Sequence, residues 1–166
     1  MKSVYKNLYF PNLVEGAVKI EDDRGFIEIL YESNNVVLKR TTSKSGVFRG
    51  MHVQPFPYLQ NKIIRVVSGK ILDFITDPSD EKEKVFYTEI TPEDEWVHID
   101  AKYAHGFYTP EDSVFEYLCD GTYNEFSEKA YRIDHLLLEK LQFADIILSS
   151  KDSNCKSYGE VLIKAL

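Results

Sequence analysis

The sequence is poor in cysteine, has fewer basic than acidic residues and contains no long uncharged apolar run. Its two cysteines, Cys119 and Cys155, do not have the spacing of a disulfide framework or a zinc knuckle, so we expect both to be reduced thiols. Nowhere do eighteen uncharged apolar residues follow one another, and the first ten residues hold no signal-peptide core. These absences predict a cytoplasmic protein that does not bind a membrane.

The charge balance argues against polyanionic partners. Twenty basic residues against 27 acidic ones give a formal charge of −7, which offers no general attraction to nucleic acid. An anionic ligand would therefore need a local cluster of basic side chains. With 166 residues, the chain is most simply one domain, spanning 1–166.

Aromatic residues are abundant, with eleven Tyr and ten Phe, and they suit pleated sheets. Between residues 26 and 120, short apolar runs alternate with turn residues and predict about eight strands: "FIEILY", "NVVLKRT", "GVFRGMHVQ", "KIIRVVSG", "KILDFIT", "KVFYTEI", "EWVHID" and "SVFEYLC". Regularly spaced strands of this kind are typical of a sandwich, barrel or jelly roll.

Three local elements can be predicted around these strands. Residues 62–76 should form a hairpin with Ser68 and Gly69 at its turn. The leucines of "DHLLLEKLQF" recur at helical intervals after Asp134, which is a possible N-cap. The closing "SYGEVLIKAL" fits either a helix or a strand.

The stretch "GVFRGMHVQ" (46–54) carries unusual residues for a strand. Alternation would place Phe48, Gly50, His52 and Gln54 on one face. Gly50 leaves room there for a ligand or for a close backbone. The alternative is that His52 is an ordinary core histidine and that Gly50 marks a bulge; this strand alone does not decide.

Other polar residues also lie within apolar runs. Asp73 has apolar neighbours on both faces of its strand, so its charge needs a partner. That partner is either a Lys or Arg in a structural ion pair, or a catalytic cation or histidine. Lys62 could be a solvated strand end and His105 a structural residue. Tyr117 shares a face with Phe115 and could be core.

A metal site is not indicated. The strand of His52 offers one histidine rather than a His-x-His pair, and His98 and Tyr103 add no glutamate at ligand spacing to His105. We therefore expect no metal and no other cofactor.

Taken in order, these residues form a recognisable set: "RGMH" with Gln54, Lys62 ten residues after His52, "VVSG" leading to Asp73, "AHGF" with His105, "YLCDGTY" with Tyr117 and Tyr123, and "LSSKD" ending at Asp152. From residue 22 to residue 152 the chain resembles the dTDP-4-dehydrorhamnose 3,5-epimerase family. The resemblance implies a mostly β, cupin-type double-stranded β-helix (jelly roll) with short C-terminal helices. It also implies a homodimer that epimerises a nucleotide diphosphate sugar beside its 4-keto group without a metal.

The same resemblance implies catalytic roles for five residues. His52 is similar to the general base, and Asp152 to the carboxylate that orients it. Tyr117 is similar to the acid that returns a proton on the opposite face of the sugar. Lys62 matches the lysine beside the enolate oxygen, and Asp73 matches a neighbour in the pocket.

Five further residues are implied to bind substrate. Arg24 and Arg49 match positions that grip the diphosphate, with Lys39 or Arg40 as possible additions. Gln54 and His105 match pocket positions, and Tyr123 matches an aromatic ring near the nucleotide base. Arginine suits this task because its planar fork fits phosphate oxygens.

The chemistry explains why such residue types are needed. Removing a proton beside a ketone develops charge on its oxygen, which a cation stabilises by about 3–4 kcal/mol, by analogy with an oxyanion-hole donor. Inversion requires a base on one face and an acid on the other, and each contributes about 10²–10⁴-fold.

The chain also departs from the family pattern. "LKRTTSKSG" replaces a polar Asn-x-Ser stretch, "PSDEKEK" replaces a Ser-Pro-Thr-type segment, Lys102 replaces a glycine, Glu28 comes one residue early, and a leucine-rich stretch replaces a tryptophan-bearing segment. The substrate therefore stays open, as does inversion at C3, at C5 or at both. The alternatives are a nucleotide-sugar 3,4-ketoisomerase and a non-catalytic sugar-binding cupin.

Overall fold

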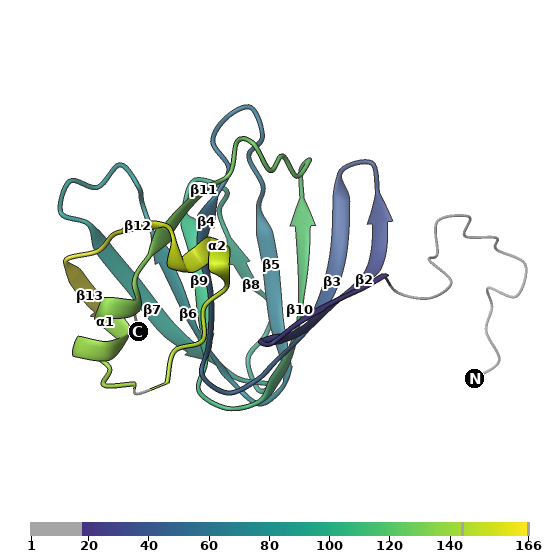
Figure 1. Cartoon of the computed structure of the whole chain (residues 1–166). Helices are drawn as coiled ribbons and strands as arrows, with labels where there is room; N and C mark the ends of the chain where they lie inside the picture. The colour runs from purple at the N-terminus through teal and green to yellow at the C-terminus, as the bar shows by residue number, and fades with distance from the viewer. Residues whose placement is uncertain (1–17, 144, 166) are drawn as a thin grey trace, which may run out of the picture.

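The computed structural model describes residues 18–143 and 145–165, which form two β-sheets and two short helices (Figure 1). The strands are β1 (Val18–Asp22), β2 (Gly25–Ser33), β3 (Val36–Ser43), β4 (Val47–Val53), β5 (Lys62–Ser68), β6 (Ile71–Thr76), β7 (Lys84–Ile90), β8 (Val97–Ile99), β9 (Ala104–Thr109), β10 (Ser113–Asp120), β11 (Lys129–Arg132), β12 (Lys156–Ser157) and β13 (Val161–Lys164). The helices are α1 (Asp134–Glu139) and α2 (Ser150–Ser153).

The two sheets interleave strands that are distant in sequence. One sheet has the order β1-β2-β3-β10-β5-β8 and the other the order β12-β11-β4-β9-β6-β7-β13. All eight predicted runs are strands, and the mostly β, jelly-roll-type architecture is confirmed. Prediction missed β9, whose residues "AHGFYT" are buried on both faces and so show no alternation, as well as β1, β11 and β12.

The predicted hairpin over residues 62–76 is wrong. β5 pairs with β10 and β8, whereas β6 pairs with β7 and β9 in the other sheet. The turn at Gly69 is therefore a corner between sheets. Gly69 has a φ of 72°, and a Cβ there would lie 2.5 Å from the carbonyl oxygen of Asp112, so the corner requires glycine.

The helix near residue 134 is confirmed, but its predicted cap is wrong. Ile133 is the N-cap, and Asp134 lies in the first turn, where its carboxylate pairs with Arg132 Nε at 2.8 Å. Ile133 is fully buried, so packing rather than capping fixes where the helix begins. The closing segment is strand β13, parallel to β7. Neither helix is long and apolar enough to cross a membrane.

Two apolar clusters hold the sheets in place. One lies between the sheets and includes Ile64, Phe107 and Phe115. The other covers the opposite face of the seven-stranded sheet, where Phe48 and Leu136 belong to the same cluster. The C-terminal segment with α1 therefore closes one side of that sheet and leaves its other side to face the six-stranded sheet.

The outward face of the six-stranded sheet carries an ion-pair cluster in which a buried Glu116 lies between two exposed arginines. Glu116 of β10 accepts hydrogen bonds from Arg40 of β3 at 2.6 and 3.0 Å and from Arg65 of β5 at 2.8 and 3.0 Å. Since Phe115 and Tyr117 face inward, Glu116 and its partners face outward. The suggestion that Arg40 could join a phosphate site is therefore wrong.

Candidate active site

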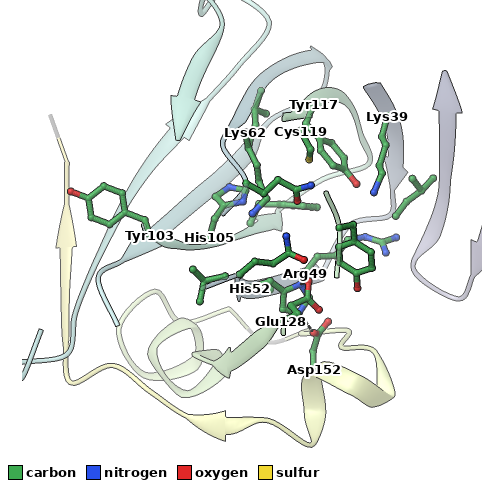
Figure 2. A pocket seen from close by; sticks show the side chains of 18 of the residues that line it. Lys39, Arg49, His52, Lys62, Tyr103, His105, Tyr117, Cys119, Glu128 and Asp152 are labelled. Atoms are coloured by element: carbon green, nitrogen blue, oxygen red, sulfur yellow. Dashed lines mark hydrogen bonds and ion pairs between the residues drawn. The ribbon is translucent and has the colours of Figure 1, made fainter. Parts of the chain in front are cut away.

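A cavity of about 380 Å³ opens between the two sheets (Figure 2). Its lining takes residues from both sheets and from the C-terminal segment around α2. Of the predicted site residues, all except Asp73 line it: Arg24, Arg49, His52, Gln54, Lys62, His105, Tyr117, Tyr123 and Asp152. The cavity thus gathers residues that are up to 128 positions apart in sequence.

A bulge in β4 directs His52 into the cavity. The register of β4 against β9 shifts between Arg49 and His52, so simple alternation fails here. Arg49, Gly50 and His52 all line the cavity, while Phe48 belongs to the apolar cluster on the other face. The predicted shared face is therefore wrong for Phe48. Gly50 has a φ of 115°, and a Cβ there would lie 2.5 Å from Gly106 Cα, so the close neighbour is backbone.

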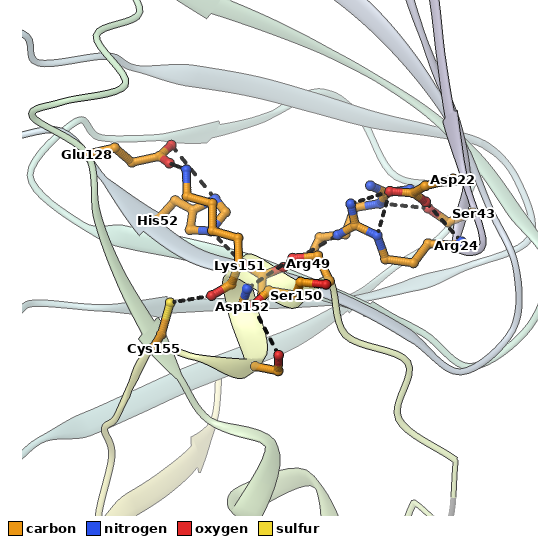
Figure 3. A network of polar contacts seen from close by, with 12 residues as sticks. Asp22, Arg24, Ser43, Arg49, His52, Glu128, Ser150, Lys151, Asp152 and Cys155 are labelled. Carbon is orange, nitrogen blue, oxygen red and sulfur yellow. Dashed lines mark hydrogen bonds and ion pairs between the residues drawn. The ribbon is translucent and has the colours of Figure 1, made fainter.

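His52 is held by a carboxylate from α2 (Figure 3). Asp152 Oδ1 lies 2.8 Å from His52 Nε2, and Asp152 Oδ2 accepts a hydrogen bond from Ser149 Oγ at 2.8 Å. Burial alone would raise the pKa of Asp152, but His52, Ser149 and Arg24 lower it overall. Because an ionised carboxylate only accepts hydrogen bonds, Nε2 carries the proton and Nδ1 is the basic nitrogen.

A second carboxylate faces His52 from the other side. Glu128 Oε1 lies 3.8 Å from His52 Nδ1, and Glu128 forms an ion pair with Lys151. Sequence reasoning missed both residues, since Glu128 precedes a short strand and no periodic pattern singles it out. It also missed Ser149, the N-cap of α2, although its spacing of three before Asp152 is a capping signal.

Tyr117 reaches the cavity from the sheet opposite His52. Phe115, Tyr117 and Cys119 all line the cavity, as their shared face predicts. Burial raises the pKa of the Tyr117 phenol well above its ordinary value, so it is protonated across the neutral range. The base and this hydroxyl therefore stand on opposite walls.

Lys62 lies at the start of β5 on the same wall as Tyr117 (Figure 2). It is partly buried, which excludes the solvated strand end. Burial lowers the pKa of its ammonium group, and the charges of Cys119, Glu128 and Asp73 oppose that shift. In the described part of the chain, no carboxylate lies within salt-bridge distance of Lys62, so its charge is available to a bound molecule.

Asp73 does not line the cavity, but it contacts His105, which does. His105 Nε2 lies 2.6 Å from Asp73 Oδ1, and both residues are buried. The charge of Asp73 is thus met by a histidine rather than by Lys or Arg. His105 presents the rest of its ring to the cavity, which makes Asp73 a residue that orients another.

The basic side chains that line the cavity differ in how closely they contact acidic groups of the protein. Arg24 donates two hydrogen bonds to Asp22 Oδ2, at 2.5 and 3.0 Å, and one to Asp152 at 3.4 Å. Arg49 is only 11% exposed, and its buried Nη2 has no hydrogen-bond partner among the described residues. Lys39 lies over the Tyr117 ring at 5.7 Å. Arg49 Nη2 lies 4.0 Å from Asp22 Oδ1 and Arg49 Nε donates to Ser43 Oγ at 3.4 Å, so the guanidinium has one long ion pair but hydrogen-bonding capacity to spare. Such a buried guanidinium beside an open cavity is suited to an anionic ligand.

Gln54 was expected to bind substrate, but its side chain forms hydrogen bonds to a neighbouring loop. Its amide nitrogen donates to the carbonyls of Tyr58 and Thr122, and its amide oxygen accepts from the backbone N–H of Asn124. With these groups engaged, Gln54 fixes the loop that carries Tyr123. The Tyr123 ring is 52% exposed at the rim of the cavity, where a planar ligand could stack on it.

No group of three or more His, Cys, Asp or Glu side chains in the described residues is arranged to hold a metal ion. The expectation of a reaction without metal or cofactor stays a prediction.

Comparison with known proteins agrees with this geometry. The sequence profile described as dTDP-4-dehydrorhamnose 3,5-epimerase matches residues 13–160. The dTDP-4-dehydrorhamnose 3,5-epimerase of Sulfolobus tokodaii is 29% identical, with a TM-score of 0.64 over 87% of this chain and 89% of that one. The enzyme of that name from Elizabethkingia anophelis is 26% identical, with a TM-score of 0.61 over 90% and 94%. No curated protein sequence matches the chain.

A third structure is informative because it holds a ligand. The dTDP-6-deoxy-D-glucose-3,5-epimerase of Legionella pneumophila, in complex with dTDP-4-keto-L-rhamnose, is 25% identical. Its TM-score is 0.61, over 86% of this chain and 85% of that one. The cupin-type fold that the resemblance implied is confirmed by these structures.

Proposed function

The chain belongs to the dTDP-4-dehydrorhamnose 3,5-epimerase family, and from this premise we propose that it epimerises a nucleotide-linked 4-keto-6-deoxy sugar. One observation carries the proposal. A carboxylate-held histidine, His52, and a protonated phenol, Tyr117, face one cavity from opposite sheets, with the Lys62 ammonium beside them. This arrangement fits a reaction that removes a proton from one face of a ring and returns one to the other.

In the proposed reaction, His52 Nδ1 removes the proton from a carbon beside the C4 ketone. The electrons of the C–H bond form the enolate, whose oxygen is stabilised by Lys62. Tyr117 then donates its hydroxyl proton to the same carbon from the opposite face, which inverts the centre. Asp152 holds the His52 ring and offsets the charge that it gains.

The diphosphate is expected at the basic end of the cavity. Arg49 offers a buried Nη2 that has no hydrogen-bond partner among the described residues, and Arg24 and Lys39 line the same cavity. Tyr123 at the rim would stack on the base. The homodimer that the resemblance implies remains a prediction, which sedimentation of the purified chain would check.

The test uses dTDP-4-keto-6-deoxyglucose in deuterated water, with NMR to locate the label. We expect deuterium at C3, at C5 or at both, with inversion at each labelled centre. His52→Ala and Tyr117→Phe should each reduce the rate of inversion about 10²–10⁴-fold. His98→Ala and Tyr31→Phe, at exposed positions outside the cavity lining, serve as matched controls.

Each outcome of this test has a clear meaning. Movement of the carbonyl to C3 would replace the proposal with a 3,4-ketoisomerase. Tight binding of the sugar without label would replace it with a sugar-binding cupin. Undiminished inversion in both variants would refute the assigned base and acid.

A further inference from the structure

Every inversion leaves the protein with its protons in the wrong places. His52 holds the proton taken from the sugar, and Tyr117 lacks the one that it gave. Before the next sugar is processed, His52 must release its proton to water. The roles assigned so far explain abstraction and donation, but none of them explains this release.

We propose that Glu128 accepts the proton from His52 Nδ1 and passes it to solvent. The inference rests on the proposed epimerase function and adds a proton exit to it. In the transfer, the Nδ1–H bond breaks as an O–H bond forms on Glu128 Oε1, so that imidazolium and carboxylate become neutral imidazole and carboxylic acid. The acid then gives its proton to water, which restores the carboxylate.

The geometry separates the two nitrogens of His52. Nε2 is bonded to Asp152 and therefore keeps its proton throughout. Nδ1 faces Glu128 Oε1 at 3.8 Å, which is too long for a hydrogen bond and leaves the Nδ1 lone pair free to act as the base. Once Nδ1 is protonated, the imidazolium attracts the Glu128 carboxylate. A decrease of about 1 Å in the distance between Nδ1 and Oε1 is enough to form a hydrogen bond.

Asp152 is unsuited to act as the exit. It is 2% exposed, and its oxygens already bind His52, Ser149 and Arg24. Any proton that it took would still lie inside the molecule. Lys62 is a cation and cannot accept a proton in that form.

Glu128 lies between His52 and Lys151, as Figure 3 shows. It contacts Lys151, whose side chain is 48% exposed, while Glu128 itself is 9% exposed. The His52 side chain is 28% exposed, toward the cavity that the sugar would fill, so Glu128 offers its Nδ1 a neighbouring carboxylate that also contacts a surface lysine. The ion pair with Lys151 also holds Glu128 back from neutral His52, which keeps Nδ1 clear for the sugar.

The test compares Glu128→Gln with the wild type and with Glu125→Gln, an exposed neighbour that does not line the cavity. With enzyme in excess over sugar, the rate constant of a single inversion in Glu128→Gln should lie within a few-fold of the wild-type value. Under multiple turnover its rate should fall about 10²-fold or more. Small proton carriers, such as added imidazole or formate, should restore that turnover in proportion to their concentration.

A merely structural Glu128 gives a different pattern. If Glu128→Gln loses the same factor in rate in single and in multiple turnover, and proton carriers do not restore it, the proposed role of Glu128 is overturned. A wild-type rate of multiple turnover in Glu128→Gln would overturn it as well. Glu128→Asp, which keeps a carboxylate, should retain more turnover than Glu128→Gln if both remain folded by circular dichroism. If the wild type itself takes up no deuterium from any 4-keto sugar, the proposed function fails and the exit fails with it.

Discussion

Lys62 has an unusual setting for a lysine, since it is partly buried and faces an open cavity without a carboxylate partner in the described chain. Burial lowers the pKa of its ammonium group. The charge that the enolate needs is therefore lost at a lower pH than in a solvated lysine. Tyr117 shifts the other way, because burial raises its pKa.

We predict that the alkaline limb of kcat reports Lys62. As pH rises through the lowered pKa, Lys62 loses its proton and turnover falls. Lys62→Arg, whose guanidinium stays charged, should move this limb to higher pH even if its maximal rate is lower. Lys62→Met should lose about 10²–10³-fold in kcat at neutral pH. Coincident alkaline limbs for the wild type and Lys62→Arg would contradict the assignment.

Single residues were predictable where a family pattern or a local rule marked them. His52, Tyr117 and Asp152 stand in recognisable short motifs, and the cavity lining includes all three. Glu128 and Lys151 were missed because their position depends on how a loop and a short helix dock against β4. No spacing in the sequence encodes a contact of that kind.

At the scale of elements, the bulge in β4 decides what the strand can do. A regular strand would have pointed Phe48 and His52 the same way. The extra residue separates them, so Phe48 enters the core and His52 the cavity. The sequence offered a ligand site or a bulge as alternative explanations of Gly50; the bulge is present in β4, and Gly50 and His52 also line the cavity, where the site remains our proposal.

We predict that Gly50→Ala destabilises the protein and displaces His52. The φ of 115° alone costs an alanine about 1–3 kcal/mol, and the Cβ would clash with the backbone of Gly106. Thermal unfolding and turnover should therefore both decline. Met51→Leu, a nearly volume-conserving change at the next residue, should cost less than about 1.5 kcal/mol. Equal melting temperatures for Gly50→Ala and the wild type would show that β4 tolerates a regular path.

The mistaken hairpin has a related cause. Ser68 and Gly69 give a correct turn signal, but a turn does not state whether the next strand pairs with the last. Here β5 and β6 separate into different sheets, because each finds its partners elsewhere in the chain. Strand identity is local, whereas pairing depends on distant segments.

For the molecule as a whole, Glu116 joins three strands of one sheet through Arg40 and Arg65. Burial alone would raise the pKa of Glu116, but the hydrogen bonds and charges of the two arginines lower it overall. A carboxyl whose pKa is lower in the folded state stabilises that state above its unfolded pKa. The contribution is lost as pH falls through the folded value.

We predict that Glu116→Gln lowers the free energy of unfolding at pH 7 by about 1.5–3 kcal/mol, the usual range for hydrogen bonds to a charged group. The difference from wild type should shrink below about pH 4.3, where the unfolded carboxyl takes up a proton. Denaturant unfolding at several pH values measures both effects. Glu111→Gln, at an exposed position, is the control. A constant difference down to pH 3 would show that the charge of Glu116 contributes nothing.

The His52–Asp152 contact joins residues 100 positions apart. Because a chain is made from its N-terminus, a ribosome-bound chain that ends between residues 117 and 151 already contains His52, Lys62 and Tyr117 but lacks Asp152 to hold the imidazole. If the proposed chemistry is right, it must wait until Asp152 has been added and has left the ribosome, and a nascent chain stalled before that point should not invert its sugar.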